Sequence, residues 1–207
     1  MQQECLSQII MTSRRPLSTP HRLTRFALLT VTAWLGACAS LPNDASVVEQ
    51  LDDQTGLTIA RLGRPLELYR ENFRKDTLGK FAFLGPIETN QMGRRELYLW
   101  LALPLEDTAS PVKPVVTVNG TVLELPEPGR APDAAGLQST PYKVPMSWIA
   151  TFYYRVDQPT VARLGEASTL RIQVTEDTKA GPLKTAYQLE LAGDPRLREF
   201  AARQEDL

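Results

Sequence analysis

The sequence predicts an all-β protein, an antiparallel β-sandwich that ends in a short C-terminal helix. About eight short segments alternate apolar and polar residues with the period of a strand, and turn-forming residues separate them. No segment has the spacing of a strand–helix–strand unit, which disfavours a parallel sheet. A small β-barrel is the alternative architecture.

The first strands lie after a polar stretch without periodicity, residues 41–50, which we expect to be a tether. Asp52–Gly56 is a cluster of turn residues. Leu57–Arg61 and Leu66–Arg70 each alternate as half-buried strands do, and Gly63-Arg64-Pro65 separates them. These segments predict two half-buried strands.

The middle of the chain contains its longest apolar segments. Phe81–Thr89 predicts a strand that bends at Gly85-Pro86, and Pro86 indicates an edge or a bulge because it has no amide hydrogen to donate. Glu96–Leu103 is apolar on both faces, which is typical of a central strand. Its Leu, Glu and Ala residues also allow a helix. We prefer the strand because Pro104 follows and the surrounding pattern is β.

The clearest local pattern is a hairpin at Asn119-Gly120. The segment 115–118 precedes these residues and 121–125 follows them, and both are rich in β-branched residues. Asn-Gly favours a two-residue type I′ turn, in which both residues need positive φ. Residues 126–145 contain five prolines and two glycines, and they predict a long loop.

The C-terminal part predicts further strands, a helical turn and a closing helix. The expected strands are 147–156, 170–174 and 187–191, and the expected helical turn is 159–165. Asp194 is the expected N-cap of a helix over Pro195–Gln204. We expect an immunoglobulin-like arrangement from the number of strands and a buried Trp148, although the Cys–Trp–Cys core of antibody domains is absent.

The N-terminal part has the organisation of an export signal. A basic lead contains Arg14, Arg15, Arg22 and Arg25. Phe26–Ala37 is then an uncharged, mostly apolar run of 12 residues. A membrane span needs about 20 residues. The run therefore fits a signal core better than a transmembrane helix.

The end of this run, Leu35-Gly36-Ala37-Cys38, resembles the lipobox of bacterial lipoproteins. The resemblance implies cleavage before Cys38, a diacylglycerol on its sulfur and an acyl chain on its new amine. Three chains bury enough hydrocarbon for stable anchoring, whereas one chain alone is marginal. The alternative is an ordinary signal peptide, or a buried helix, with an accidental cysteine.

The resemblance also implies a domain organisation and a location. Residues 1–37 are the expected signal peptide, with Met11 as an alternative start, 38–50 the lipidated N-terminus and tether, and 51–207 a periplasmic β-sandwich. Ala39 follows the lipidated cysteine. Aspartate at that position directs retention in the inner membrane of enteric bacteria, so its absence favours the outer membrane.

Processing would change the composition in a way that limits the chemistry. Cleavage after residue 37 leaves 170 residues with 19 basic and 23 acidic side chains, and a formal charge of −4 instead of −1. This balance gives no electrostatic reason to bind nucleic acid. The only other cysteine and the only histidine, Cys5 and His21, lie in the removed part.

The remaining domain offers no recognisable catalytic or metal-binding set. A histidine base for a Ser or Cys nucleophile and the usual zinc ligands are both missing, so we expect no cofactor, no metal and no enzyme. Asp44, Asp52 and Asp53 do not have the spacing of an EF-hand and indicate a solvated turn. Arg94-Arg95 likewise indicates a solvated turn rather than an anion site.

Two further patterns allow a functional as well as a structural interpretation. Tyr142, Tyr153, Tyr154 and Trp148 could form an aromatic binding patch, but aromatic residues in strands more often belong to the core. A pair of carboxylates could hydrolyse glycans without histidine. The sequence does not indicate which carboxylates would converge.

The stretch 85–100, Gly-Pro-Ile-Glu-Thr-Asn-Gln-Met-Gly-Arg-Arg-Glu-Leu-Tyr-Leu-Trp, resembles uncharacterised proteobacterial lipoproteins. This resemblance implies a location and no activity. The sequence therefore predicts a non-enzymatic binding or assembly module, attached to the lipid bilayer through Cys38 and working with another envelope protein. The alternative is a carboxylate-dependent hydrolase of cell-wall or exported glycans.

Overall fold

The computed structural model describes residues 46–71, 81–105, 112–143, 149–178, 180–191 and 194–205. These residues belong to one compact unit. Their strands are β1 (Val47–Asp52), β2 (Leu57–Leu62), β3 (Leu66–Arg70), β4 (Phe81–Gln91), β5 (Arg94–Leu103), β6 (Val115–Val118), β7 (Thr121–Val122), β8 (Ala150–Val156), β9 (Thr169–Thr178) and β10 (Gly181–Glu190). Their helices are the 3₁₀-helix η1 (Pro132–Ala135), α1 (Gln158–Gly165) and α2 (Pro195–Glu205).

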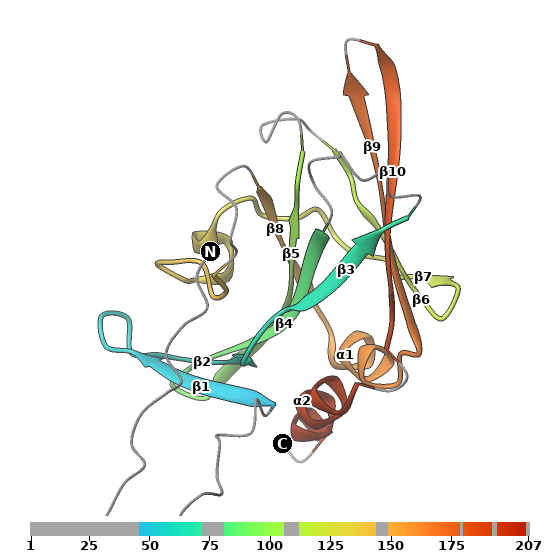
Figure 1. Ribbon diagram of the computed structural model, residues 1–207. Helices are drawn as coiled ribbons and strands as arrows, with labels where there is room; N and C mark the ends of the chain where they lie inside the picture. Colours follow the sequence, from blue (N-terminus) through green and yellow to red (C-terminus); the bar gives the residue numbers. More distant parts are fainter. Residues whose placement is uncertain are drawn as a thin grey trace, which may run out of the picture. The chain divides into compact units, whose positions relative to one another are not determined.

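The expected all-β, antiparallel sandwich with a C-terminal helix is confirmed. All ten described strands join one open, hydrogen-bonded sheet, in which every pairing is antiparallel (Figure 1). One path runs β1-β2-β4-β3-β10-β9-β6-β7, and β5 and β8 extend from β4. Because this sheet stays open, the described strands do not form the small closed barrel that was the alternative.

Strand β4 connects the two parts of the sheet because both of its edges are paired. One edge pairs with β5 along its length, from Phe83 to Gln91. The other edge pairs with β3 over Phe81–Leu84 and with β2 over Ile87–Asn90. Gly85 and Pro86 lie in the gap between these two partners, where the missing amide hydrogen of Pro86 costs no ladder bond. The expected bend therefore falls at a branch point of the sheet.

Tyr142 fills the gap at this branch point. Its hydroxyl donates to the Pro86 carbonyl oxygen at 2.7 Å and accepts from the Leu62 amide at 3.2 Å. A Cβ added to Gly85 would lie only 2.5 Å from the Tyr142 ring, so a glycine is required for this close approach. The Tyr142 ring also packs against Trp100, with 4.9 Å between the ring centroids.

Strand β5 is the central strand that its pattern predicts, since it pairs with β4 on one side and with β8 on the other. Leu99, Trp100 and Leu101 are fully buried, so both faces are covered and the competing helix does not form. The hairpin at Asn119-Gly120 is also confirmed, because φ is +49° at Asn119 and +79° at Gly120.

Several strand boundaries differ from the prediction, most of all at β1, β9 and β10. Residues 47–50 were expected in the tether, but they form most of β1, which pairs with β2 from Val47↔Leu62 to Asp52↔Leu57. The tether interpretation is therefore wrong for these residues. The sequence did not indicate a strand here because β1 is an exposed edge strand, which needs little apolar periodicity. Strands β9 and β10 are ten residues each, longer than their alternating parts suggest. Trp148 lies outside the described residues.

The two helices pack against each other where α1 ends (Figure 1). Asp157 caps α1 by accepting from the Thr160 amide at 3.0 Å, and Asp194 accepts from the Arg196 amide at 2.8 Å at the start of α2. A Cβ on Gly165 would lie 2.6 Å from the Cβ of Ala201, so small residues allow the helices to approach closely. The C-terminal helix and its capping residue are therefore as predicted.

Candidate functional site

The lipobox residues Leu35, Gly36, Ala37 and Cys38 lie outside the described residues, so their assignment stays a prediction from the sequence. Within the part of the chain that the structure describes, no group of three or more His, Cys, Asp or Glu side chains could hold a metal ion. No helix among these residues is long and apolar enough to cross a membrane. The described polar groups of interest are two glutamate-centred clusters at the β4–β5 hairpin.

The first cluster surrounds Glu88, a buried carboxylate on β4. Gln204 of α2 donates from its Nε2 to Glu88 Oε2 at 2.8 Å. The Arg95 Nε lies 3.4 Å from Glu88 Oε1, and the Arg203 Nε lies 3.8 Å from Oε2. Both carboxylate oxygens therefore have partners, which a buried charge requires.

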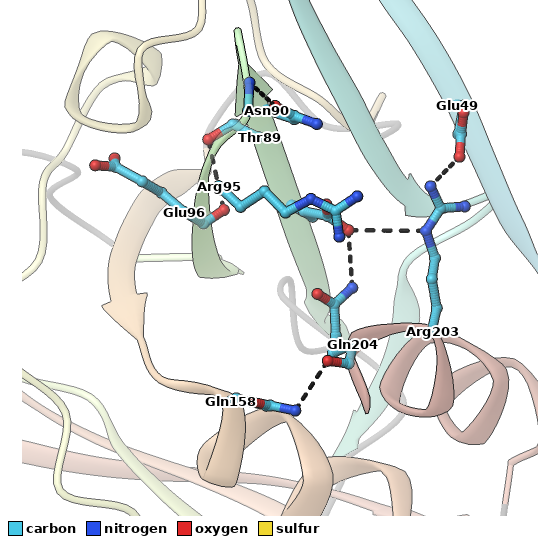
Figure 2. A network of polar contacts seen from close by, with 10 residues as sticks. Glu49, Thr89, Asn90, Arg95, Glu96, Gln158, Arg203 and Gln204 are labelled. Carbon is cyan, nitrogen blue, oxygen red and sulfur yellow. Dashed lines mark hydrogen bonds and ion pairs between the residues drawn. The ribbon is translucent and has the colours of Figure 1, made fainter. Parts of the chain in front are cut away.

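The cluster continues from Glu88 to both ends of the described domain. Arg203 also pairs with Glu49 on the edge strand β1. Gln158, the first residue of α1, donates from its Nε2 to the Gln204 carbonyl oxygen at 2.9 Å. Figure 2 shows these contacts between α1, α2 and the sheet. We call the set of Glu49, Glu88, Arg95, Arg203 and Gln204 the helix clamp, because it attaches α2 to the strands.

The second cluster surrounds Glu96 on β5. The Tyr98 hydroxyl donates to Glu96 Oε2 at 2.6 Å, and Arg94 and Arg155 lie 3.0 Å and 3.1 Å from Oε1. The hydrogen bond from Tyr98 lowers the pKa of Glu96, and the two arginine charges add to this effect. Burial, together with the same hydrogen bond, raises the pKa of Tyr98 to about 12.

The two glutamates lie on opposite faces of the sheet. Leu97 is opposite Glu88 and Glu96 is opposite Thr89, so the two glutamates occupy neighbouring rungs of the β4–β5 ladder, whose side chains point to opposite faces. Figure 2 shows the side chains of Arg95 and Glu96 leaving β5 in opposite directions. These two carboxylates therefore do not form the converging pair that glycan hydrolysis needs. Their arginine partners suit structural attachment better than proton transfer.

Sequence reasoning missed Glu88, although the sequence carried a sign of it. Glu88 directly follows Ile87 in a strand that is apolar almost throughout, where an unpaired charge is costly. Its partners Arg203 and Gln204 come from a helix more than 110 residues further along the chain. The sequence alone could indicate a buried ion pair at Glu88, but it could not name these partners.

The other singled-out residues have structural roles in the described domain. Tyr142, Tyr153 and Tyr154 are buried, so the core interpretation holds and they form no exposed patch. Asp52 accepts from the Gln54 amide at 3.0 Å, which lowers its pKa and fits the expected turn. Asp53 belongs to the same turn, whereas Asp44 lies outside the described residues.

The arginines Arg94 and Arg95 begin β5 immediately after the Met92-Gly93 turn. Arg94 is mostly exposed and pairs with Glu96, as a residue beside a solvated turn can. Arg95 points to the other face and belongs to the helix clamp. The solvated-turn interpretation therefore describes Arg94 well and Arg95 only in part.

No protein-family model, no curated protein and no solved structure matches this chain.

Proposed function

We propose that this chain is a lipoprotein of the bacterial cell envelope, cleaved before Cys38, acylated on that residue and held on the periplasmic side of the outer membrane. The observation that carries the proposal is the coincidence of a basic lead, a 12-residue apolar run and Leu35-Gly36-Ala37-Cys38. Each part alone is common. Their order and spacing are those of a lipoprotein signal.

The anchor would keep the described domain close to the bilayer. Eight residues, 39–46, separate Cys38 from the start of β1 at Val47. Fully extended, such a segment spans at most about 28 Å. The edge strand β1 would then lie within this distance of the lipid surface, where other envelope proteins are also concentrated.

The domain would act as a binding or assembly module. Strand β1 pairs only with β2 among the described strands, and its Val48 and Leu51 side chains are exposed. An unpaired strand edge with exposed apolar side chains favours contact with an extended segment of another protein. This observation supports a partner protein that contributes an extended segment. Crosslinking in intact cells followed by pulldown tests it, and a monomer without a reproducible partner would contradict it.

The glycan-hydrolase alternative is not favoured by a specific observation. Glu88 and Glu96, the two carboxylates at the centres of the polar clusters, lie on opposite faces of the sheet. We therefore retain the binding module as the proposed function.

The anchoring proposal has a direct test with a matched control. Cells that express the Cys38→Ala variant are grown with an alkyne-labelled fatty acid, beside cells that express the wild type or Cys5→Ala. We expect the label in the wild type and in Cys5→Ala, because Cys5 lies upstream of the cleavage point. The Cys38→Ala variant should be unlabelled. Label that persists in Cys38→Ala would contradict the proposal.

A further inference from the structure

A crevice is lined by residues of the β6–β7 hairpin and of the C-terminal end of helix α1. Its volume is about 320 Å³, and it is lined by Val118, Asn119, Thr121, Leu123, Arg163 and Glu166. This volume lies at the small end of the range for ligand sites, about 300–1,000 Å³, so it suits one small molecule. The crevice is separate from the helix clamp and from the Glu96 cluster.

Asn119 fixes the two walls of the crevice relative to each other. Its Oδ1 accepts from the amides of Ser168 and Thr169 at 2.8 Å and 3.0 Å, and from the Ser168 hydroxyl at 2.8 Å. Its Nδ2 donates to the Glu166 carbonyl oxygen at 3.4 Å. Because the hairpin turn is attached to the end of α1 in this way, the crevice is formed before any ligand enters.

The walls of the crevice differ in chemistry. Val118 and Leu123 are buried and supply apolar surface. Arg163 lies in the last turn of α1 and Glu166 is the residue that follows the helix, and both are exposed and line the crevice. Neither side chain forms a hydrogen bond or ion pair with another described residue, beyond a long-range attraction between Arg163 and Asp157.

We propose that this crevice binds a small zwitterionic peptide with an aliphatic side chain. The Arg163 guanidinium suits the carboxylate of such a peptide, because it offers two parallel donors. Glu166 suits the ammonium group, and the carbonyl oxygens at the end of α1 favour a cation there. The aliphatic side chain would then cover Val118 and Leu123. This site does not depend on the proposed lipid anchor.

The test uses the full chain in a non-ionic detergent and the dipeptide Leu-Leu as the probe. Calorimetric titration should show saturable binding below about 10 mM. Arg163→Gln and Glu166→Gln should each weaken this binding about fivefold. Lys184→Gln and Glu67→Gln remove the same charges from exposed positions on β10 and β3, and they should leave the affinity unchanged.

Two modified peptides assign each charge to its partner. N-acetyl-Leu-Leu lacks the ammonium group, so Glu166→Gln should not weaken its binding further. Leu-Leu-amide lacks the carboxylate, so Arg163→Gln should not weaken the binding of this peptide further. Thermal unfolding of each variant checks that it is folded. Absence of saturable binding to the folded wild type, or equal affinity of the wild type and both crevice variants, would overturn the proposal.

Discussion

At the scale of single residues, Tyr142 is the side chain that the branched sheet depends on most directly. One edge of β4 pairs with β3 before Gly85-Pro86 and with β2 after it. The gap between these two partner strands leaves backbone groups that need hydrogen-bond partners. The Tyr142 hydroxyl serves the Leu62 amide and the Pro86 carbonyl oxygen together. Burial in this gap raises the pKa of Tyr142, so the hydroxyl stays protonated and can donate.

Tyr142→Phe therefore tests the branch point. The substitution leaves the ring in place and removes the hydroxyl, so the buried Leu62 amide loses its partner. We expect the free energy of unfolding to fall by about 1–3 kcal/mol, as measured by urea denaturation. Tyr69→Phe is the matched control, because Tyr69 is 58% exposed, and it should change stability by less than about 0.5 kcal/mol. Equal effects of the two substitutions would contradict this role for Tyr142.

At the scale of elements, the helix clamp explains how α2 is attached to the sheet. The helix has a cap at Asp194, where burial opposes ionisation but hydrogen bonds from Arg196 still lower the pKa of the carboxyl. The cap favours helix formation and does not by itself place the helix. Attachment comes from apolar residues such as Phe200 and from the contacts of Gln204 and Arg203 with Glu88.

Glu88→Ala tests the clamp. It removes the common partner of Arg95, Arg203 and Gln204, and we expect a loss of about 2–3 kcal/mol in urea denaturation. This value is below that of a fully buried pair because the two arginines keep 34% and 35% of their side chains exposed. Glu49→Ala breaks only the outer pair, whose carboxylate is 50% exposed, and should cost about 0.5 kcal/mol or less. A larger loss for Glu49→Ala than for Glu88→Ala would refute the clamp.

At the scale of the whole molecule, the fold class was predictable because the strands alternate and the turns are marked by Asn-Gly and by proline. Asn119-Gly120 and the apolar faces of β5 are local signals, and both were interpreted correctly. The edge strand β1 was missed because exposure on both sides removes the alternation that identifies a strand.

The polar clusters could be predicted much less well. The Glu88–Gln204 contact joins residues that are 116 positions apart. Tyr142 contacts Leu62 and Pro86, which are 80 and 56 positions away. No local pattern encodes such partners. The crevice also depends on tertiary contacts, since Asn119 meets Ser168 only when the hairpin packs against the end of α1. Turn chemistry predicted the conformation of Asn119 but not its contacts.

The stability of the whole domain should depend on pH in the acid range. Arg171 donates to the Glu71 carboxylate from its Nε at 2.7 Å and from its Nη2 at 3.0 Å. These hydrogen bonds lower the pKa of Glu71 from the ordinary 4.5. The hydrogen bond from Tyr98 lowers the pKa of Glu96 in the same way. A pKa lowered in the folded state stabilises the fold above the unfolded value, and this contribution is lost as pH falls through the folded value.

The urea midpoint should therefore change little between about pH 7 and pH 5 and should fall below about pH 4.5. The double variant Glu71→Gln, Glu96→Gln should show a smaller decrease over the same range, because two of the titrating groups are gone. A midpoint that rises on acidification below pH 4.5, or the same decrease in both proteins, would contradict this account.

We propose that the chain is anchored through Cys38, and the mass of the N-terminal peptide shows whether this residue is the lipidated terminus. The protein is purified from bacterial envelopes, digested with a protease, and the N-terminal peptide is fragmented in the mass spectrometer. We predict a peptide that begins at Cys38 and carries a diacylglycerol on the sulfur and an acyl chain on the amine. An N-terminal peptide that begins elsewhere, or one with an unmodified Cys38, would contradict the claim.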